Sequence, residues 1–181
     1  MIKNYLEKLS PFSLNDKSDL APSVQFEKFF PIWYLELIKP YNGRIFFKKG
    51  AVFSPLIKAP IIDKDISIDF LYGNSNGEGG LNHNIKNSFN AIQNELFLSF
   101  GECPGGDKVC IEKTTGAVYY FWHEALTDDS RLFHLSDSLE DFIEQLHPED
   151  DEEKVDSKTR GTPSKKLLDF IKKSKLKEHL E

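Results

Sequence analysis

A histidine stands beside a glutamate at the end of an apolar stretch, at His123 and Glu124, with Trp122 before them. An imidazole held by a carboxylate can act as a general base, and a hydrolase that uses this pair is the enzymatic alternative. The same pair can equally form a structural hydrogen bond or offer polar groups to a partner protein. Adjacent residues of a β-strand point to opposite faces of the sheet, which argues against a working dyad. We therefore assign no catalytic residue and predict that the protein is not an enzyme.

Two cysteines, Cys103 and Cys110, flank a second stretch with possible chemistry, the turn Pro104–Asp107. If they face each other across a hairpin, they could form a redox pair or half of a metal site. They lack the two-residue gap of a zinc knuckle, and the chain has no other cysteine. A buried free cysteine behaves as a small apolar residue. We predict two unconnected thiols in a reducing compartment and no metal site.

A third candidate is the glycine-rich segment Gly77–Gly80. It lacks the glycine spacing of a dinucleotide-binding or phosphate-binding loop, and no Lys-Ser or Lys-Thr pair follows it. The histidines are scattered, without the His-Glu-x-x-His pattern of zinc enzymes, and no Gly-x-Ser-x-Gly motif marks a nucleophilic serine. We interpret this segment as a polar loop and predict no cofactor.

The first two candidates border three predicted β-strands, Leu96–Gly101, Lys108–Lys113 and Ala117–His123. The strands are rich in valine, isoleucine, phenylalanine and tyrosine, which suit a half-buried sheet. Two glycine-containing turns separate them. Because connections this short imply antiparallel neighbours, the stretch predicts a β-meander. A further short strand is predicted at Leu132–Leu135.

Helices are predicted on both sides of the meander, each from an apolar stripe at helical spacing. One stripe is Ile85, Phe89, Ile92 and Leu96, and the other is Leu139, Phe142, Ile143 and Leu146. Residues 24–38 indicate a helix, a break and a second helix that begins near Pro31 and turns Trp33, Tyr34, Leu37 and Ile38 to the core. Residues 44–53 are predicted as a strand or hairpin bent at Gly50, and residues 61–72 as one strand.

The chain of 181 residues has a formal net charge of −6. Residues 1–147 contain 14 basic and 20 acidic residues and are predicted to form one domain. Residues 148–162 are predicted as a charged linker and residues 163–181 as a basic helical tail. An acidic domain argues against nucleic acid as the partner, and no stretch has the composition of a membrane span or a secretory signal. We therefore predict a cytoplasmic protein with neither a nucleic acid nor a membrane as its partner.

The order of several motifs resembles the SUKH superfamily, which includes fungal cell-wall-assembly regulators and bacterial immunity proteins. Phe30-Pro31 followed by Tyr41-Asn42-Gly43 is similar to the opening motif of that family. The segment Phe70–Gly73 is similar to a strand end of the family, and Glu102–Glu124 to its Gly-Gly-Asp and Val-Tyr-Tyr meander. Residues 138–143 are similar to its terminal helix. The resemblance covers roughly residues 20–147.

This resemblance implies an α+β fold, with a largely antiparallel sheet and helices packed beside it. It implies a protein-binding module without catalytic residues or cofactors. For a stand-alone bacterial copy it implies an immunity protein that neutralises a cognate toxin, often a nuclease, and an acidic domain would suit a basic toxin. The alternative is a regulatory interaction module like the fungal members. Those members carry long disordered flanks, so we favour the immunity protein for this chain.

We expect the partner to contact one acidic and aromatic patch at the strand ends and turns of the meander. The predicted contact residues are Glu102, Asp107, Trp122, His123 and Glu124, together with Glu78 and Asp128 on loops that approach them. The alternative for Trp122 is that it packs in the core, as large aromatic residues usually do.

Overall fold

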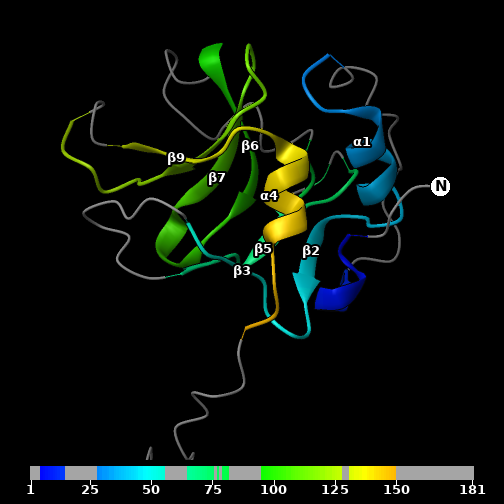
Figure 1. Ribbon diagram of the computed structural model, residues 1–181. Coiled ribbons are helices and arrows are strands. Elements are labelled where there is room, and N and C mark those ends of the chain that lie inside the picture. Colours follow the sequence, from blue (N-terminus) through cyan, green and yellow to red (C-terminus); the bar gives the residue numbers. More distant parts are fainter. Residues whose placement is uncertain are drawn as a thin grey trace, which may run out of the picture. The chain divides into compact units, whose positions relative to one another are not determined.

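The fold is built on an antiparallel sheet of seven strands (Figure 1). The computed structural model describes residues 5–14, 28–55, 65–75, 77, 79–81, 95–127 and 131–149. In spatial order the strands are β1 (Pro11–Phe12), β2 (Arg44–Phe47), β5 (Phe70–Tyr72), β6 (Phe97–Glu102), β7 (Lys108–Glu112), β8 (Val118–Phe121) and β9 (Leu132–Ser136). Every neighbouring pair is antiparallel. The predicted α+β class with a largely antiparallel sheet is therefore confirmed.

The predicted meander is also confirmed, since β6, β7, β8 and β9 are neighbours in chain order. The single turn of 3-10 helix η2 (Pro104–Gly106) joins β6 to β7, and Gly105 and Gly106 both have positive φ angles there. Strands β7 and β8 pair from Lys108 opposite Phe121 to Ile111 opposite Val118. This register brings the start of β7 beside the end of β8, which decides the surroundings of the predicted contact residues.

Two expectations for the region before the meander are wrong. Residues 44–53 form two strands in different sheets, because β3 (Val52–Phe53) leaves the main sheet and pairs with β4 (Ile66–Ser67). Residues 66–72 are not one strand either. The backbone N–H of Ile68 donates to Ala51, while that of Asp69 donates to Glu102, so the chain crosses from the small sheet to the large one at this point.

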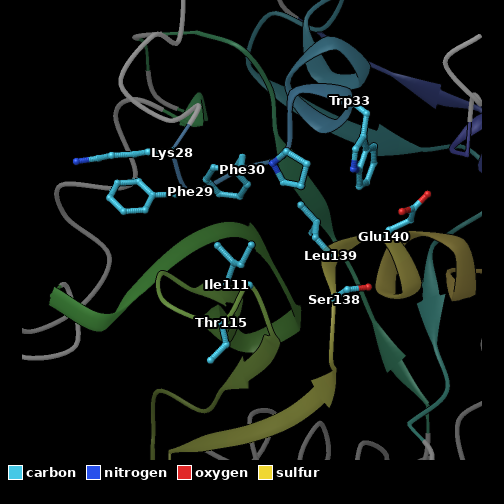
Figure 2. A pocket seen from close by; sticks show the side chains of 11 residues that line it. Lys28, Phe29, Phe30, Trp33, Ile111, Thr115, Ser138, Leu139 and Glu140 are labelled. Atoms are coloured by element: carbon cyan, nitrogen blue, oxygen red, sulfur yellow. The ribbon is translucent and has the colours of Figure 1, made fainter.

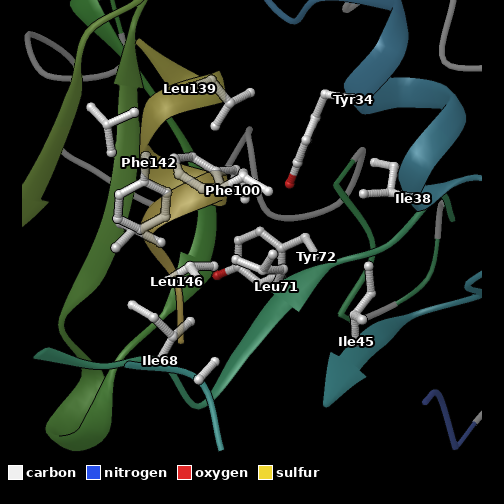
Figure 3. Packing of buried hydrophobic residues seen from close by; sticks show 14 of the residues in the cluster. Tyr34, Ile38, Ile45, Ile68, Leu71, Tyr72, Phe100, Leu139, Phe142 and Leu146 are labelled. Carbon is white, nitrogen blue, oxygen red and sulfur yellow. The ribbon is translucent and has the colours of Figure 1, made fainter. Parts of the chain in front are cut away.

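Two helices cover the same face of the main sheet. They are α1 (Ile32–Ile38) and α4 (Leu139–Gln145), and Ser138 caps α4 by accepting a hydrogen bond from the backbone N–H of Asp141 at 3.1 Å. The buried Phe100 of β6 lies between them (Figure 3). Its ring centroid is 6.1 Å from that of Tyr34 in α1 and 5.7 Å from that of Phe142 in α4. One aromatic side chain therefore ties both helices to the sheet.

The predicted core faces of the two helices are largely confirmed. Tyr34, Leu37 and Ile38 are buried, and so are the four residues of the predicted second stripe, of which Leu146 directly follows α4. Trp33 is only half-buried. The first half of the predicted helix pair at 24–38, most of the helix predicted from Ile85, and the linker and tail beyond Glu149 lie outside the described residues. Within the described ranges, no helix has the length and apolar character needed to cross a membrane.

Candidate functional site

Asp107 is the centre of a hydrogen-bond cluster at one end of the meander. Its side chain accepts hydrogen bonds from the Tyr120 hydroxyl and from the backbone N–H of His123, the latter at 2.9 Å. The same Oδ1 atom lies 2.7 Å from Nδ1 of His123. Burial and the Asp107 hydrogen bond together raise the pKa of Tyr120, which therefore stays a donor. With only 8% of its surface exposed, Asp107 joins the start of β7 to the end of β8.

Glu102 has a similar internal role on the neighbouring strand. Its Oε1 atom accepts a hydrogen bond from the Tyr72 hydroxyl at 2.5 Å and another from Nζ of Lys108 at 3.2 Å. These contacts link β5, β6 and β7 through one carboxylate. Burial, and then the bond to Glu102, raise the pKa of Tyr72. Glu102 is thus engaged with its own domain, and its side chain is only 27% exposed.

The remaining predicted contact residues that the structure describes are more accessible. Trp122 is half-buried, while the side chains of His123 and Glu124 are 42% and 71% exposed. Nε2 of His123 lies 3.9 Å from Oε1 of Glu124, so the carboxylate that holds the imidazole closely is Asp107. The sequence pattern had suggested Glu124 for that role. Glu78 and Asp128, the other two predicted contacts, lie outside the described residues.

Neither cysteine lies in this cluster of polar groups. Cys103 and Cys110 are free and buried, and they belong to two separate apolar clusters. Burial raises the pKa of both thiols, which keeps them protonated and unreactive at neutral pH. This arrangement agrees with two unconnected thiols. Among the described residues, no group of three or more histidine, cysteine, aspartate or glutamate side chains is arranged to hold a metal ion.

A cleft that no sequence pattern predicted lies at the opposite end of the meander. Its volume is about 370 Å³, and residues from four parts of the chain line it: 28–31 with Trp33, Ile111, 115–116 and 138–140. Figure 2 shows Lys28 and Phe29 on one side and Trp33 and Glu140 on the other. Leu139 lies between the two sides. The cleft is formed by the start of α1, the turn between β7 and β8, and the start of α4.

The two sides of the cleft differ in charge. On one side, Nζ of Lys28 lies 4.6 Å from the centre of the Phe29 ring, and Nζ of Lys113 lies 5.5 Å from it. Burial and the charge of Lys28 lower the pKa of Lys113. On the other side, Glu140 accepts a hydrogen bond of 2.7 Å from the Tyr5 hydroxyl, which comes from the chain start. The cleft therefore has a basic side and an acidic side.

Motifs that are distant in the sequence meet in the structure beside β2 and β5. The backbone N–H of Gly73 donates to Gly43 at 2.7 Å, and that of Asn74 donates to Tyr41 at 2.9 Å. The sequence profile of the SMI1/KNR4 family (SUKH-1) matches residues 25–145, which span these motifs, the meander and both helices. The chain belongs to this family. The family resemblance noted in the sequence is thus confirmed. A comparison with curated proteins found no match.

Membership of the SMI1/KNR4 family (SUKH-1) places both ends of the meander inside the family domain. The matched region ends at residue 145, where α4 also ends, and it contains Asp107, His123 and all the residues that line the cleft. The superfamily is known for immunity and for regulatory protein interactions. The question for this chain is therefore which surface meets a partner.

Proposed function

We propose that the protein is an immunity protein that binds a cognate toxin domain and neutralises it. Family membership carries the proposal, because the superfamily is known for immunity and regulatory protein-interaction roles. The net charge of −6 supports a basic partner, and charge complementarity accelerates encounter between two proteins. A toxin domain that cleaves nucleic acid would supply such a basic surface. The proposal places the protein in the cytoplasm and assigns it no catalysis and no cofactor.

The surroundings of His123 support binding over catalysis. A serine- or cysteine-type mechanism requires a hydroxyl or thiol within hydrogen-bond reach of the histidine base. Within the described residues, the ring nitrogens of His123 face the carboxylates of Asp107 and Glu124. The imidazole is thus held as part of the β7–β8 junction. Its exposed edge, with Trp122 and Glu124, is the contact surface that the sequence suggested, and it competes with the cleft at the other end of the meander.

Co-expression with a toxin encoded by the neighbouring gene tests this function. We expect cells that produce the toxin to survive only when the immunity protein is present. We also expect the protein and a catalytically inactive toxin domain to elute as one complex in size-exclusion chromatography. The absence of both protection and a complex would contradict the proposal. Recovery of signalling proteins in a pull-down, with no toxin bound, would favour the regulatory alternative.

A further inference from the structure

The cleft opposite Asp107 has walls that the core holds in place. On one wall, Trp33 packs edge-on against Tyr5 and Tyr34, with ring centroids 5.6 and 5.8 Å apart. At its base, Phe30 and Leu139 are 1% and 2% exposed. The cleft volume of about 370 Å³ lies near the lower end of the range of ligand pockets, about 300 to 1,000 Å³. It suits a large side chain with its flanking backbone better than a whole folded element.

The acidic side of the cleft continues along α4. Glu140, Asp141 and Glu144 are exposed on this helix. Nζ of Lys8 donates to the backbone carbonyl of Glu144 at 2.6 Å, so Glu140 and Asp141 are the acidic residues that a partner's cation would meet. On the opposite side, Lys28 and Lys113 both lie against the ring of Phe29. A cationic group of a bound partner would be attracted to the first side and repelled from the second. A bound segment with a basic residue is therefore favoured in the direction that places this residue on the acidic side of the cleft.

We propose that this cleft takes one large apolar side chain from a segment of the toxin, with a basic residue of that segment against Glu140 and Asp141. This inference rests on the proposed function and names the surface and the chemistry that it uses. Charge complementarity argues for this occupant, because the protein is acidic overall and its acidic helix borders the aromatic walls. Aromatic side chains around a desolvated anchor are the usual source of binding energy in an interface.

The two tryptophans provide a test, because Trp33 lines the cleft and Trp122 lies at the other end of the meander. The whole protein is labelled with 5-fluorotryptophan, and its two fluorine resonances are assigned with the variants Trp33→Phe and Trp122→Phe. The probe is the catalytically inactive toxin domain of the neighbouring gene, which carries no label. We expect the Trp33 resonance to shift when the complex forms and the Trp122 resonance to stay in place.

Affinity measurements with matched variants complete the test. We expect Phe29→Ala to weaken binding about 30-fold, which is typical of an anchor at the centre of an interface. Ile32→Ala is the apolar control, since Ile32 is 70% exposed and lies beside the cleft without lining it. Glu140→Lys should weaken binding at least about 10-fold, whereas Glu124→Lys, the same charge change at the other end, should have a much smaller effect. Thermal unfolding confirms that each variant is folded.

The possible failures are distinguishable. If a complex forms but Phe29→Ala binds like the wild type and only the Trp122 resonance shifts, the cleft is not the contact surface, and the proposed function still holds. If Phe29→Ala unfolds, two other results still test the cleft. They are the affinity of Glu140→Lys compared with that of Glu124→Lys, and which tryptophan resonance shifts on binding. If no complex forms with the toxin domain, the proposed function fails, and the partner assigned to the cleft fails with it.

Discussion

Asp107 shows how one carboxylate can serve a turn and a strand end at once. Its three hydrogen bonds come from Tyr120 and His123, at the far end of the hairpin that begins beside it. In such a position a carboxylate contributes to stability chiefly because its removal leaves donors without an acceptor. We therefore assign Asp107 a structural role that precedes any contact with a partner.

The variant Asp107→Ala should lower the free energy of unfolding by about 2 to 3 kcal/mol, because hydrogen bonds to a charged group contribute about 1.5 to 3 kcal/mol. Urea denaturation, followed by fluorescence or circular dichroism, measures this change. Glu124→Ala is the matched control, since Glu124 is exposed and should cost no more than about 0.5 kcal/mol. Equal losses for the two variants would show that the Asp107 cluster does not stabilise the fold.

The sequence pattern predicted that Asp107 and His123 belong to one patch, but it did not predict the hydrogen bonds between them. Their contact depends on the pairing of Lys108 with Phe121, a register that no local pattern specifies. The sequence also treated Trp33 as a core residue, because helical spacing reports a face of the helix without reporting what covers it. The role of a residue is therefore hard to predict from sequence when it depends on a contact with a residue far away in the chain.

Among the elements, those that depend on local signals were predictable. The meander and α4 follow from glycine turns, apolar alternation and a serine cap, which are all encoded within a few residues. The division of residues 66–72 between two sheets was not predictable, since it follows from hydrogen bonds to Ala51 and Glu102. The cleft was missed for the same reason, because four separate segments must come together to form it.

At the scale of the elements, Gly73 is a position where neighbouring backbone leaves no room for a side chain. A Cβ atom at this position would lie 2.3 Å from the carbonyl oxygen of Gly43 and 2.5 Å from that of Tyr41. Because both obstacles are backbone atoms, Gly73→Ala should separate the end of β5 from the turn before β2, and we expect it to cost about 3 kcal/mol. The loss is measured by chemical denaturation.

Gly77→Ala provides the control in the same loop. The nearest atom to its added Cβ is the side-chain oxygen of Ser75, 4.0 Å away, so the change should stay within about 0.5 kcal/mol. If Gly73→Ala were tolerated as well as Gly77→Ala, the contact between the two family motifs would not be needed for the fold.

At the scale of the whole molecule, the net charge of −6 should be visible in the kinetics of toxin binding. We expect the association rate constant to fall at least about 10-fold as the salt concentration rises from about 0.01 to 0.5 M, because screening shortens the range of attraction. Stopped-flow measurements with the inactive toxin domain follow this rate. The dissociation rate should change much less.

A variant with Glu140→Gln, Asp141→Asn and Glu144→Gln isolates the contribution of α4 to this attraction. Its association rate should be lower at low salt and should depend less on salt than that of the wild type. If the wild-type rate were independent of salt, the partner would not be recognised by its basic charge, and the chemistry proposed for it would be wrong.

Phe100 has a consequence for how this domain could diverge. Its buried ring contacts Phe30 and Tyr34 on one side and Phe142 on the other. Both helices that border the cleft are therefore held in position by a residue of the core. We therefore expect the exposed and half-buried residues of the basic side, such as Lys28 and Phe29, to tolerate exchange without a shift of the two helices. If the partner protein changes during evolution, single substitutions in the cleft could change which partner is recognised, while the core keeps the fold stable.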